Sequence, residues 1–400
     1  MAKKVITKSI WILSIVSLFT DISTEMLYPI TPLYLKSIGF TVVLIGVLEG
    51  VAEAISGLSK GYFGELSDKK GVRIPFIKGG YWLSAIARPL MAVFTFPAWI
   101  FGARSLDLLG KGVRTSARDA LLSDESTSET KATVFGFHRA MDTLGAVIGP
   151  SLALLYLHYN PGSYKMMFFI AFTPALLAGT TVLFLKEKKK TVTPSNVVKW
   201  PFIASFGFIK SGPAEYKKLL VGLLLFTLFN SSNAFLILKV KESGQSDTIT
   251  IGMYIFYNFI YAAFSYPLGK LADKIGVKPT FIGGLIIFAI VYAGMGFNNS
   301  MVGFFILFFL YGVFMASTEG ISRAWISNVC DKKDTGKALG VFSGLSSLLT
   351  FLASTMAGLI WYKFSPQATF FLTAIITSIV ITYFIIFIKS PSNTKKEISH

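Results

Sequence analysis

The sequence predicts an all-α integral membrane protein in which about twelve transmembrane helices form two pseudo-symmetric six-helix bundles. Hydrophobic residues make up 53% of the chain and charged residues 15%, and the mean hydropathy is +0.61. These values lie outside the range of soluble domains. Apolar runs of about 20 residues, long enough to cross a bilayer as helices, recur along most of the chain. A ten-residue segment in the first half also returns in the second half.

The apolar runs give the order of the helices. Each run is bounded by charged or turn-forming residues, and an even number of spans returns the chain to the side on which it started. A linker at 186–216, which begins with a charged run, separates an N-terminal bundle at 1–185 from a C-terminal bundle at 217–400. We expect spans near 10–36, 42–65, 74–95, 98–119, 132–157, 164–185, 217–240, 249–269, 279–297, 301–328, 337–361 and 367–388.

The net charge of +17 comes from basic residues in alternate connections between the runs. Lys186–Lys190 lie in the central connection, whereas the connections Phe94–Trp99 and Phe297–Met301 contain no Lys or Arg. Basic residues collect on the cytoplasmic side of membrane proteins. We therefore expect both termini in the cytoplasm and a multi-pass protein of the bacterial cytoplasmic (inner) membrane, and this distribution argues against nucleic-acid binding.

The repeated segment reads GELSDKKGVR at 64–73 and GKLADKIGVK at 269–278. Glycine allows a tight turn, and an acid beside basic residues can pair with neighbouring charges or with a helix N-terminus. These features favour a gate or structural motif over the alternative, two solvated basic loops. Its members are Gly64, Asp68, Lys69, Gly71 and Arg73, then Gly269, Asp273, Lys274, Gly276 and Lys278.

The repeated segment resembles the cytoplasmic loop motif of the major facilitator superfamily of secondary transporters. Gly145–Pro150 looks like a glycine-proline signature of that family, although small-residue helix packing explains it as well. Arg104, followed by Gly110 and Gly112, is similar to the family's arginine motif with a longer spacing. The runs 110–114 and 135–142 resemble a broad bacterial branch with mostly unassigned substrates. The resemblance implies alternating access, with the first and fourth helices of each half lining a central cavity.

Ionisable residues inside the predicted spans are the candidates for function, because charge at bilayer depth is expensive. Asp21, Glu25 and Tyr28 share one helical face of the first span, and Glu49 and Glu53 share a face of the second. A carboxylate in such a place can alternate between a proton and an internal cation. We expect coupling to protons at Asp21, Glu25, Glu49 and Glu53.

The fourth and fifth spans supply most of the basic groups. Arg104, Asp107 and Lys111 follow one face of the fourth span, together with Arg114 and Arg118. This stripe favours an anionic solute, such as an organic acid or a carboxylate siderophore, with Tyr28, Arg104, Asp107 and Lys111 in contact with it. Residues nearer the cytoplasm, or expected to be structural partners, are assigned to the gate: Arg114, Arg118, Asp119, His138, Arg139 and Asp142.

The second half offers polar and aromatic side chains instead of a charge stripe. Tyr254, Tyr257 and Tyr261 fall on one helical face, where they can bind a ligand or simply pack. Asn230 and Asn233 join them as substrate-binding candidates, and Glu319 and Arg323 are assigned to the gate. The acids and bases of the whole set nearly balance, so a static salt-bridge web is the alternative to a transport site.

These observations favour a secondary active transporter of a small polar, anionic solute, with protons as coupling ion and the bilayer as its surroundings. Proton-antiport export of drugs or sugars and uncoupled diffusion are the alternative transport functions. A membrane-embedded enzyme or a transport-dead sensor is less compatible, because catalytic motifs and a signalling domain are not evident. The resemblance implies a monomer, and we expect no cofactor. The single cysteine, Cys330, has no partner for a disulfide or a metal site.

Overall fold

The computed structural model describes residues 5–28, 30–40, 42–186, 207–230, 233–245 and 247–388, and throughout this part of the chain the secondary structure is helical. The helices before the linker are α1 (Lys8–Leu27), α2 (Ile30–Ser37), α3 (Val42–Lys70), α4 (Ile74–Val93), α5 (Pro97–Asp124), α6 (Lys131–Tyr159) and α7 (Tyr164–Thr181), followed by a 3₁₀ turn at Val182–Phe184. Those after it are α9 (Phe208–Ser211), α10 (Ala214–Phe229), α11 (Ala234–Glu242), α12 (Asp247–Ile275), α13 (Val277–Phe297), α14 (Met301–Val329), α15 (Thr335–Lys363) and α16 (Pro366–Phe387).

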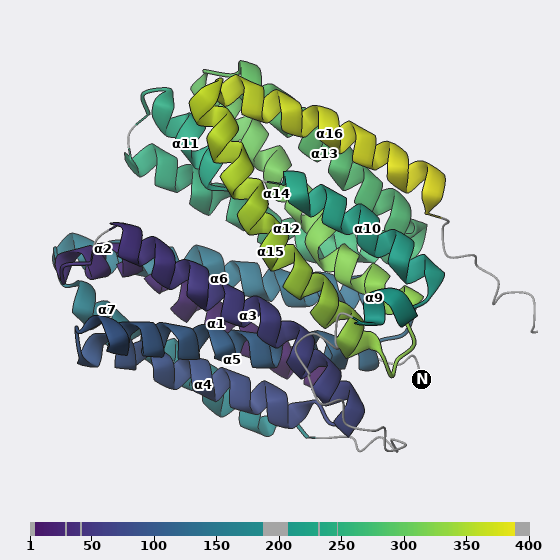
Figure 1. The fold of residues 1–400 in the computed structure, drawn as a ribbon, viewed down its shortest axis with the longest axis horizontal. Helices are drawn as coiled ribbons and strands as arrows, with labels where there is room; N and C mark the ends of the chain where they lie inside the picture. Colours follow the sequence, from purple (N-terminus) through teal and green to yellow (C-terminus); the bar gives the residue numbers. More distant parts are fainter. Residues whose placement is uncertain are drawn as a thin grey trace, which may run out of the picture.

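The helices form two bundles, which confirms the predicted fold class. Figure 1 shows α1–α7 in the lower half of the view and α9–α16 in the upper half. Seven helices of the described residues are long and apolar enough to cross a membrane on their own sequence. Large apolar side chains such as Phe351 (66% exposed) and Ile379 (63% exposed) face outward, as they do on a surface that lipid covers. The protein is therefore a multi-pass membrane protein.

The first helix of each bundle is broken, which corrects the predicted continuous spans at 10–36 and 217–240. α1 ends at Leu27 and α2 begins at Ile30, and in the second bundle α10 ends at Phe229 and α11 begins at Ala234. Pro29 follows the end of α1, and proline lacks the N–H that a continuous helix requires. The same break in both bundles is further support for an internal repeat.

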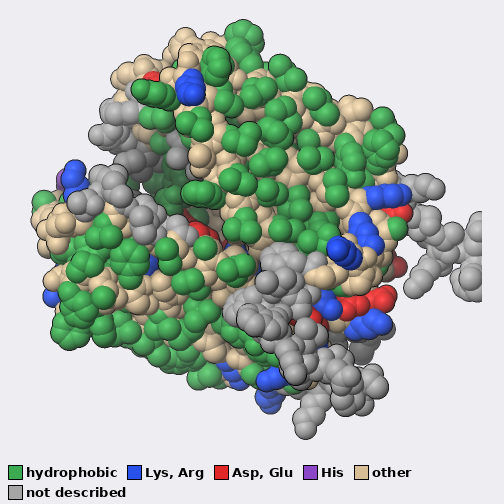
Figure 2. All heavy atoms as spheres, viewed as in Figure 1, with side chains coloured by type: hydrophobic (Ala, Val, Ile, Leu, Met, Phe, Trp, Pro, Cys, Tyr) green, Lys and Arg blue, Asp and Glu red, His purple; other side chains and the backbone are tan. Residues whose placement is uncertain are grey.

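The two bundles touch at the end that carries the repeated loops, called the motif end below. A Cβ atom added to Gly64 of α3 would lie 2.5 Å from the Gly336 carbonyl oxygen, and one added to Gly269 of α12 would lie 2.5 Å from the Ala132 carbonyl oxygen. Only glycine permits backbones to approach this closely. At the opposite end, called the open end, Figure 2 shows a hollow between the bundles.

Small residues also bring helices together inside the first bundle. A Cβ atom on Gly145 of α6 would lie 2.7 Å from the Leu18 carbonyl oxygen of α1, and one on Gly149 would lie 2.5 Å from the Ile22 carbonyl oxygen. The run Gly145–Pro150 is thus a packing face for α1. This contact holds α1, with its acidic residues, against α6.

Candidate functional site

The centre of the candidate site is a salt bridge between the two bundles. Arg139 of α6 pairs with Asp142 one turn away at 2.5 Å, and its other guanidinium nitrogen pairs with Glu319 of α14. Tyr261 of α12 donates a hydrogen bond of 2.8 Å to the second carboxylate oxygen of Glu319. Arg139 therefore connects an acid of its own helix with an acid of the other bundle.

A second ionic bridge crosses between the bundles nearer the motif end. Asp119 of α5 pairs with Arg323 of α14 and with its own neighbour Arg118, the latter at 3.0 Å. Asp119 is 1% exposed. Because Arg323 also lies 3.8 Å from Glu319, the two bridges form one network. Burial makes such a network costly to break, since each lost partner leaves a charge uncompensated.

Asp21 and Glu25 of α1 stand next to this network. The carboxyl groups of Asp21 of α1 and Asp142 of α6 lie close enough to interact with each other. Ser17, one turn earlier on α1, donates a hydrogen bond to Asp142. Tyr254 of α12 donates to Glu25 at 3.2 Å. The expected acidic stripe of α1 is therefore in contact with both bundles.

The basic face of α5 divides between two neighbours. Lys111 is half-exposed and lies 4.0 Å from Glu53 of α3, itself half-exposed, so this pair borders open space. Arg104 pairs with Asp107 on α5 at 3.2 Å. Arg114, in contrast, points into the first bundle, where it donates to the Ser84 hydroxyl at 2.6 Å and stacks over the Tyr81 ring.

The prediction of a single face for the charges of α5 is thus wrong at Arg114, because α4 packs closely enough to bind its guanidinium.

Glu49 lies on α3, but its side chain is outside the described residues. Tyr28 is 65% exposed at the end of α1. Arg88 received no role from the sequence patterns, yet this 2% exposed side chain of α4 donates to the Thr24 hydroxyl at 2.7 Å and lies 3.9 Å from Asp107.

The second bundle contributes a hydrogen-bonded group of aromatic residues. Asn233 donates to the Tyr257 hydroxyl at 2.8 Å and accepts from the Tyr311 hydroxyl at 2.6 Å. Tyr254 meets Tyr257 edge to face, with ring centroids 5.3 Å apart. Tyr311 was missed in the sequence because it lies in an almost uniformly apolar run. Asn230 lies directly after α10, at the break between α10 and α11. Its side-chain oxygen is buried and has no hydrogen-bond partner among the described residues.

His138 differs from its predicted pairing. Its Nδ1 atom lies 3.4 Å from the Ser14 hydroxyl, whereas Asp142 is bound by Arg139 and Ser17. His138 is buried, and its Nε2 atom has no hydrogen-bond partner within the described part of the chain. The i, i+4 spacing brought the two side chains to one helix face but did not decide which neighbour each would bind.

Each repeated loop binds the N-terminus of a helix in the opposite bundle. Asp68 accepts a hydrogen bond of 2.6 Å from the Lys337 backbone N–H at the start of α15, and it also pairs with Arg73. Asp273 accepts from the backbone N–H groups of Ala132 and Thr133 at the start of α6, at 3.0 and 2.7 Å. Helix N-termini favour negative charge.

The other members of the repeated motif have smaller roles at the motif end. Gly71 and Gly276 adopt positive φ angles of 64° and 108°, which explains the glycine at each turn. Lys69 pairs with Glu65 at 2.8 Å, and Lys274 is exposed. Burial raises the pKa of Asp68 to about 6, because it outweighs the opposing effects of Arg73 and the Lys337 N–H. Burial also raises the pKa of Asp273.

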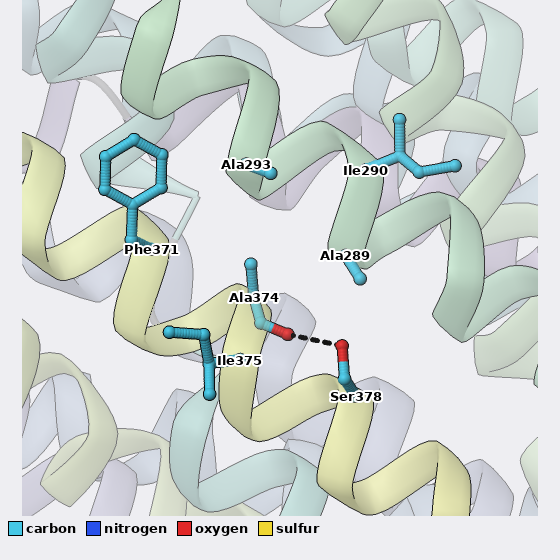
Figure 3. Close-up of a pocket in the computed structure, with 7 residues that line it drawn as sticks. All are labelled: Ala289, Ile290, Ala293, Phe371, Ala374, Ile375 and Ser378. Atoms are coloured by element: carbon cyan, nitrogen blue, oxygen red, sulfur yellow. Dashed lines mark hydrogen bonds between the residues drawn. The ribbon is translucent and has the colours of Figure 1, made fainter.

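A separate pocket lies on the outer surface of the second bundle, between α13 and α16 (Figure 3). Its volume is about 420 Å³. Its side chains are apolar apart from Ser378, whose hydroxyl donates to the Ala374 carbonyl on the same helix. The lining residues are Ala289, Ile290, Ala293, Phe371, Ala374, Ile375 and Ser378. This surface faces the bilayer and contains none of the charged groups described above.

Comparison with known proteins supports the two-bundle architecture. The sequence profile described as the Major Facilitator Superfamily matches residues 13–257 and 219–400, which together cover nearly the whole chain. The chain belongs to this superfamily. An uncharacterized MFS-type transporter of Methanocaldococcus jannaschii is 35% identical over 91% of both chains.

Two further members of the superfamily are similar over most of their length. A multi-drug resistance efflux pump PmrA homolog of Lactococcus lactis is 23% identical over 86% of this chain and 87% of its own. The crystal structure of the human organic anion transporter MFSD10 has a TM-score of 0.80 and 15% identity, and covers 94% of this chain and 98% of its own. At 15% identity, the similarity to the MFSD10 structure concerns the fold alone.

Proposed function

We propose that this superfamily member is a secondary active transporter that couples the movement of a small anionic solute to protons. The two bundles rock about the charged centre, so that the open end and the motif end are exposed in turn. The motif end faces the cytoplasm of a cytoplasmic membrane, in keeping with its many basic residues. In the structure the motif end is closed.

The position of Arg139 is the observation that carries this proposal. Its guanidinium binds Asp142 and Glu319 at once, and Asp21 lies beside Asp142. One cation therefore serves three carboxyl groups from three helices. Such an arrangement has a proton to release whenever the cation changes partners, because a buried carboxylate needs either a proton or a cation nearby.

The proposed coupling step follows from these contacts. With the motif end closed, Arg139 neutralises Glu319 and Asp142 together, and Asp21 and Asp142 share a proton, because neighbouring buried carboxylates repel each other when both are charged. When the bundles separate at the motif end, Glu319 moves away with α14. Arg139 then has only the Asp21–Asp142 pair to neutralise, and the shared proton is released toward the motif end. Reloading occurs from the open end after the bundles close again.

The half-exposed pair Lys111 and Glu53 supports an anionic solute. Their 4.0 Å separation and shared exposure mean that a solute can replace Glu53 as the partner of Lys111 at little cost. Arg118 is already bound to the buried Asp119. Arg104, in contrast, is partly exposed and is paired with Asp107 of its own helix, so that it can add to the positive charge beside Lys111. The rings of Tyr254 and Tyr257 on the facing bundle, which contact each other edge to face, provide an aromatic surface for the uncharged part of a solute.

Proteoliposomes with an entrapped pH-sensitive dye test both parts of the proposal. Organic anions, beginning with citrate, are screened for solute-dependent proton movement. We expect Asp21→Asn and Glu319→Gln to abolish proton movement, while Asp331→Asn, an exposed control, retains it. Proton movement at the parental rate in both site variants refutes the coupling step.

The choice of an anionic solute has its own test. Lys111→Met and Arg104→Ala are expected to lose uptake of the anion identified in the screen, whereas the exposed control Lys333→Met is expected to keep it. Normal handling of an anionic solute by Lys111→Met and Arg104→Ala removes this part of the proposal and leaves proton coupling to be judged separately.

Drug export by proton antiport is the second candidate. It is favoured by the similarity to the Lactococcus lactis protein named as a multi-drug resistance efflux pump homolog and by the aromatic group around Tyr257. Cationic amphipathic drugs bind well to aromatic faces beside carboxylates. Proton-driven accumulation of ethidium in inverted vesicles, lost in Glu25→Gln, would establish this function instead of anion transport.

A further inference from the structure

Lys60 is a buried cation at the contact between the two bundles. It lies on α3 with 8% of its surface exposed, and its ammonium group donates a hydrogen bond of 3.0 Å to the Ser347 hydroxyl of α15. No carboxylate oxygen of the described residues lies within 4.0 Å of its Nζ atom. The arginines Arg118, Arg139 and Arg323 at the same interface each contact a carboxylate. Glu53 and Asp119 act on this charge only from beyond that distance. A buried cation without a carboxylate in contact is unfavourable, so Lys60 requires an explanation.

The Ser347 hydroxyl also donates to the Ser343 carbonyl at 3.1 Å, but one further hydroxyl on each of the two helices has unused hydrogen-bonding capacity. Ser56, one turn away on α3, is fully buried, and its hydroxyl has no hydrogen-bond partner among the residues that the structure describes. The buried hydroxyl of Ser346, beside Ser347 on α15, is in the same situation. Helices α3 and α15 are in contact at this point: a Cβ atom added to Gly57 would lie 3.4 Å from the Ser347 Cβ atom. Hydroxyls can donate hydrogen bonds to an anion.

The internal repeat shows what is missing from this contact. Gly340 of α15 packs against the Lys60 carbonyl just as Gly136 of α6 packs against the Ser265 carbonyl, so the two contacts are equivalent. Asp142 lies six residues beyond Gly136 on α6, and Ser346 lies six residues beyond Gly340 on α15. The α6 contact thus contains its own carboxylate beside Arg139. The α15 contact has a serine at that place.

We infer that Lys60, together with the hydroxyls of Ser56 and Ser346, forms a binding site for a small monovalent anion. The ligand is a halide or a single carboxylate group, since one ammonium and a few hydroxyls match one negative charge. Access is from the hollow between the bundles, because Glu53, on the same face of α3 two turns toward the open end, is half-exposed. The bound anion supplies the negative charge that Asp142 supplies at the equivalent contact.

The anion site is independent of the solute proposed above, since it is tested on purified protein with simple salts. The melting temperature is measured in sodium chloride and in sodium methanesulfonate, whose anion is neither a halide nor a carboxylate, at equal ionic strength and pH. Because a ligand that binds only the folded protein raises its melting temperature, we expect a saturable rise with chloride. The rise is expected to be absent in Lys60→Met, which keeps the length of the side chain and removes its charge.

Lys239→Met is the matched control. Lys239 is also buried, and its ammonium group binds a neutral acceptor, Asn299 Oδ1, at 3.0 Å. Its chloride response is expected to equal that of the parent. Equal melting temperatures of the parent in chloride, acetate and methanesulfonate overturn the inference, as does a full chloride response in Lys60→Met.

Two further measurements keep the inference testable if Lys60→Met does not fold. Ser56→Ala and Ser346→Ala retain the charge but remove a donor each, so each is expected to raise the half-saturating chloride concentration roughly fivefold. An unchanged half-saturation in both variants overturns the site. Sodium acetate distinguishes the two sources of the ligand: a Lys60-dependent response to acetate assigns the site to carboxylate groups, and a response to chloride alone assigns it to free halide.

Discussion

The ionic bridge between Asp119 and Arg323 gives the most direct prediction about how the motif end is held closed. Asp119 is 1% exposed and binds Arg118 of its own helix and Arg323 of the other bundle. When the bundles separate at the motif end, Arg323 leaves with α14. Replacing Arg323 by glutamine therefore removes a contact that exists only in the closed arrangement, and it leaves the contact inside α5 unchanged.

The magnitude follows from the burial of the pair. Breaking a buried ion pair by removing one partner costs about 3–5 kcal/mol. Arg118 remains 3.0 Å from Asp119 and continues to compensate its charge, so the lower end of this range applies. At about 1.4 kcal/mol for each factor of ten, roughly 3 kcal/mol shifts the equilibrium between closed and open motif ends by about a hundredfold.

Spin-label distance measurements can follow this equilibrium. The labels are placed at the exposed positions Lys70 and Lys333, one on each bundle at the motif end, after replacement of the native Cys330 by serine. We expect a longer distance to become dominant in Arg323→Gln and in Asp119→Asn. The double variant is expected to open no further than the single variants, because both remove the same contact.

Arg88→Gln is the matched control, since Arg88 is also a buried arginine and its partners Thr24 and Asp107 lie in its own bundle. It is expected to leave the label distance unchanged. A folded Arg323→Gln protein with the parental distance distribution refutes the idea that this bridge closes the motif end. Fully additive effects of Asp119→Asn and Arg323→Gln refute the direct coupling between them.

Three further predictions concern other contacts. Gly64→Ala places a Cβ atom 2.5 Å from the Gly336 carbonyl oxygen. We expect this overpacking to destabilise the closed form by about 1–3 kcal/mol and to lengthen the distance between the same labels. Gly79→Ala, with nothing within 4 Å of the added atom, should change neither stability nor distance. The pKa of Asp68 is about 6 in the closed motif end and near 3.8 once the loop is in water, so the closed form binds the proton more tightly. Lowering the pH from 7.5 to 5 should therefore favour the closed form by about 1.4 kcal/mol, roughly tenfold. Asp68→Asn should abolish this effect of pH. Asn233→Ala leaves the hydroxyls of Tyr257 and Tyr311 without their shared partner. We therefore expect the free energy of unfolding, measured in detergent, to fall by about 1–3 kcal/mol. Asn160→Ala, at an exposed helix end, should leave it unchanged.

The sequence alone determined the fold and the location of the two loops. Apolar runs of bilayer length and a repeated loop are local properties, and in a membrane the backbone must form helices to satisfy its hydrogen bonds. Glycine at positions 71 and 276 was likewise readable, because a tight turn requires positive φ. A close-packed helix face at Gly145 also followed from a local pattern of small residues, whereas its partner helix α1 was known only from the structure.

The tertiary structure decided which charges meet. Periodicity placed Arg104, Lys111 and Arg114 on one face of a helix, yet Lys111 borders the hollow and Arg114 is bound by Ser84 of α4. The pairing of Arg139 with Glu319 joins residues that are far apart in the chain. A sequence pattern fixes the direction of a side chain along its own helix, but the partner of a buried charge depends on how two helices pack, and that is set by contacts between residues distant in sequence.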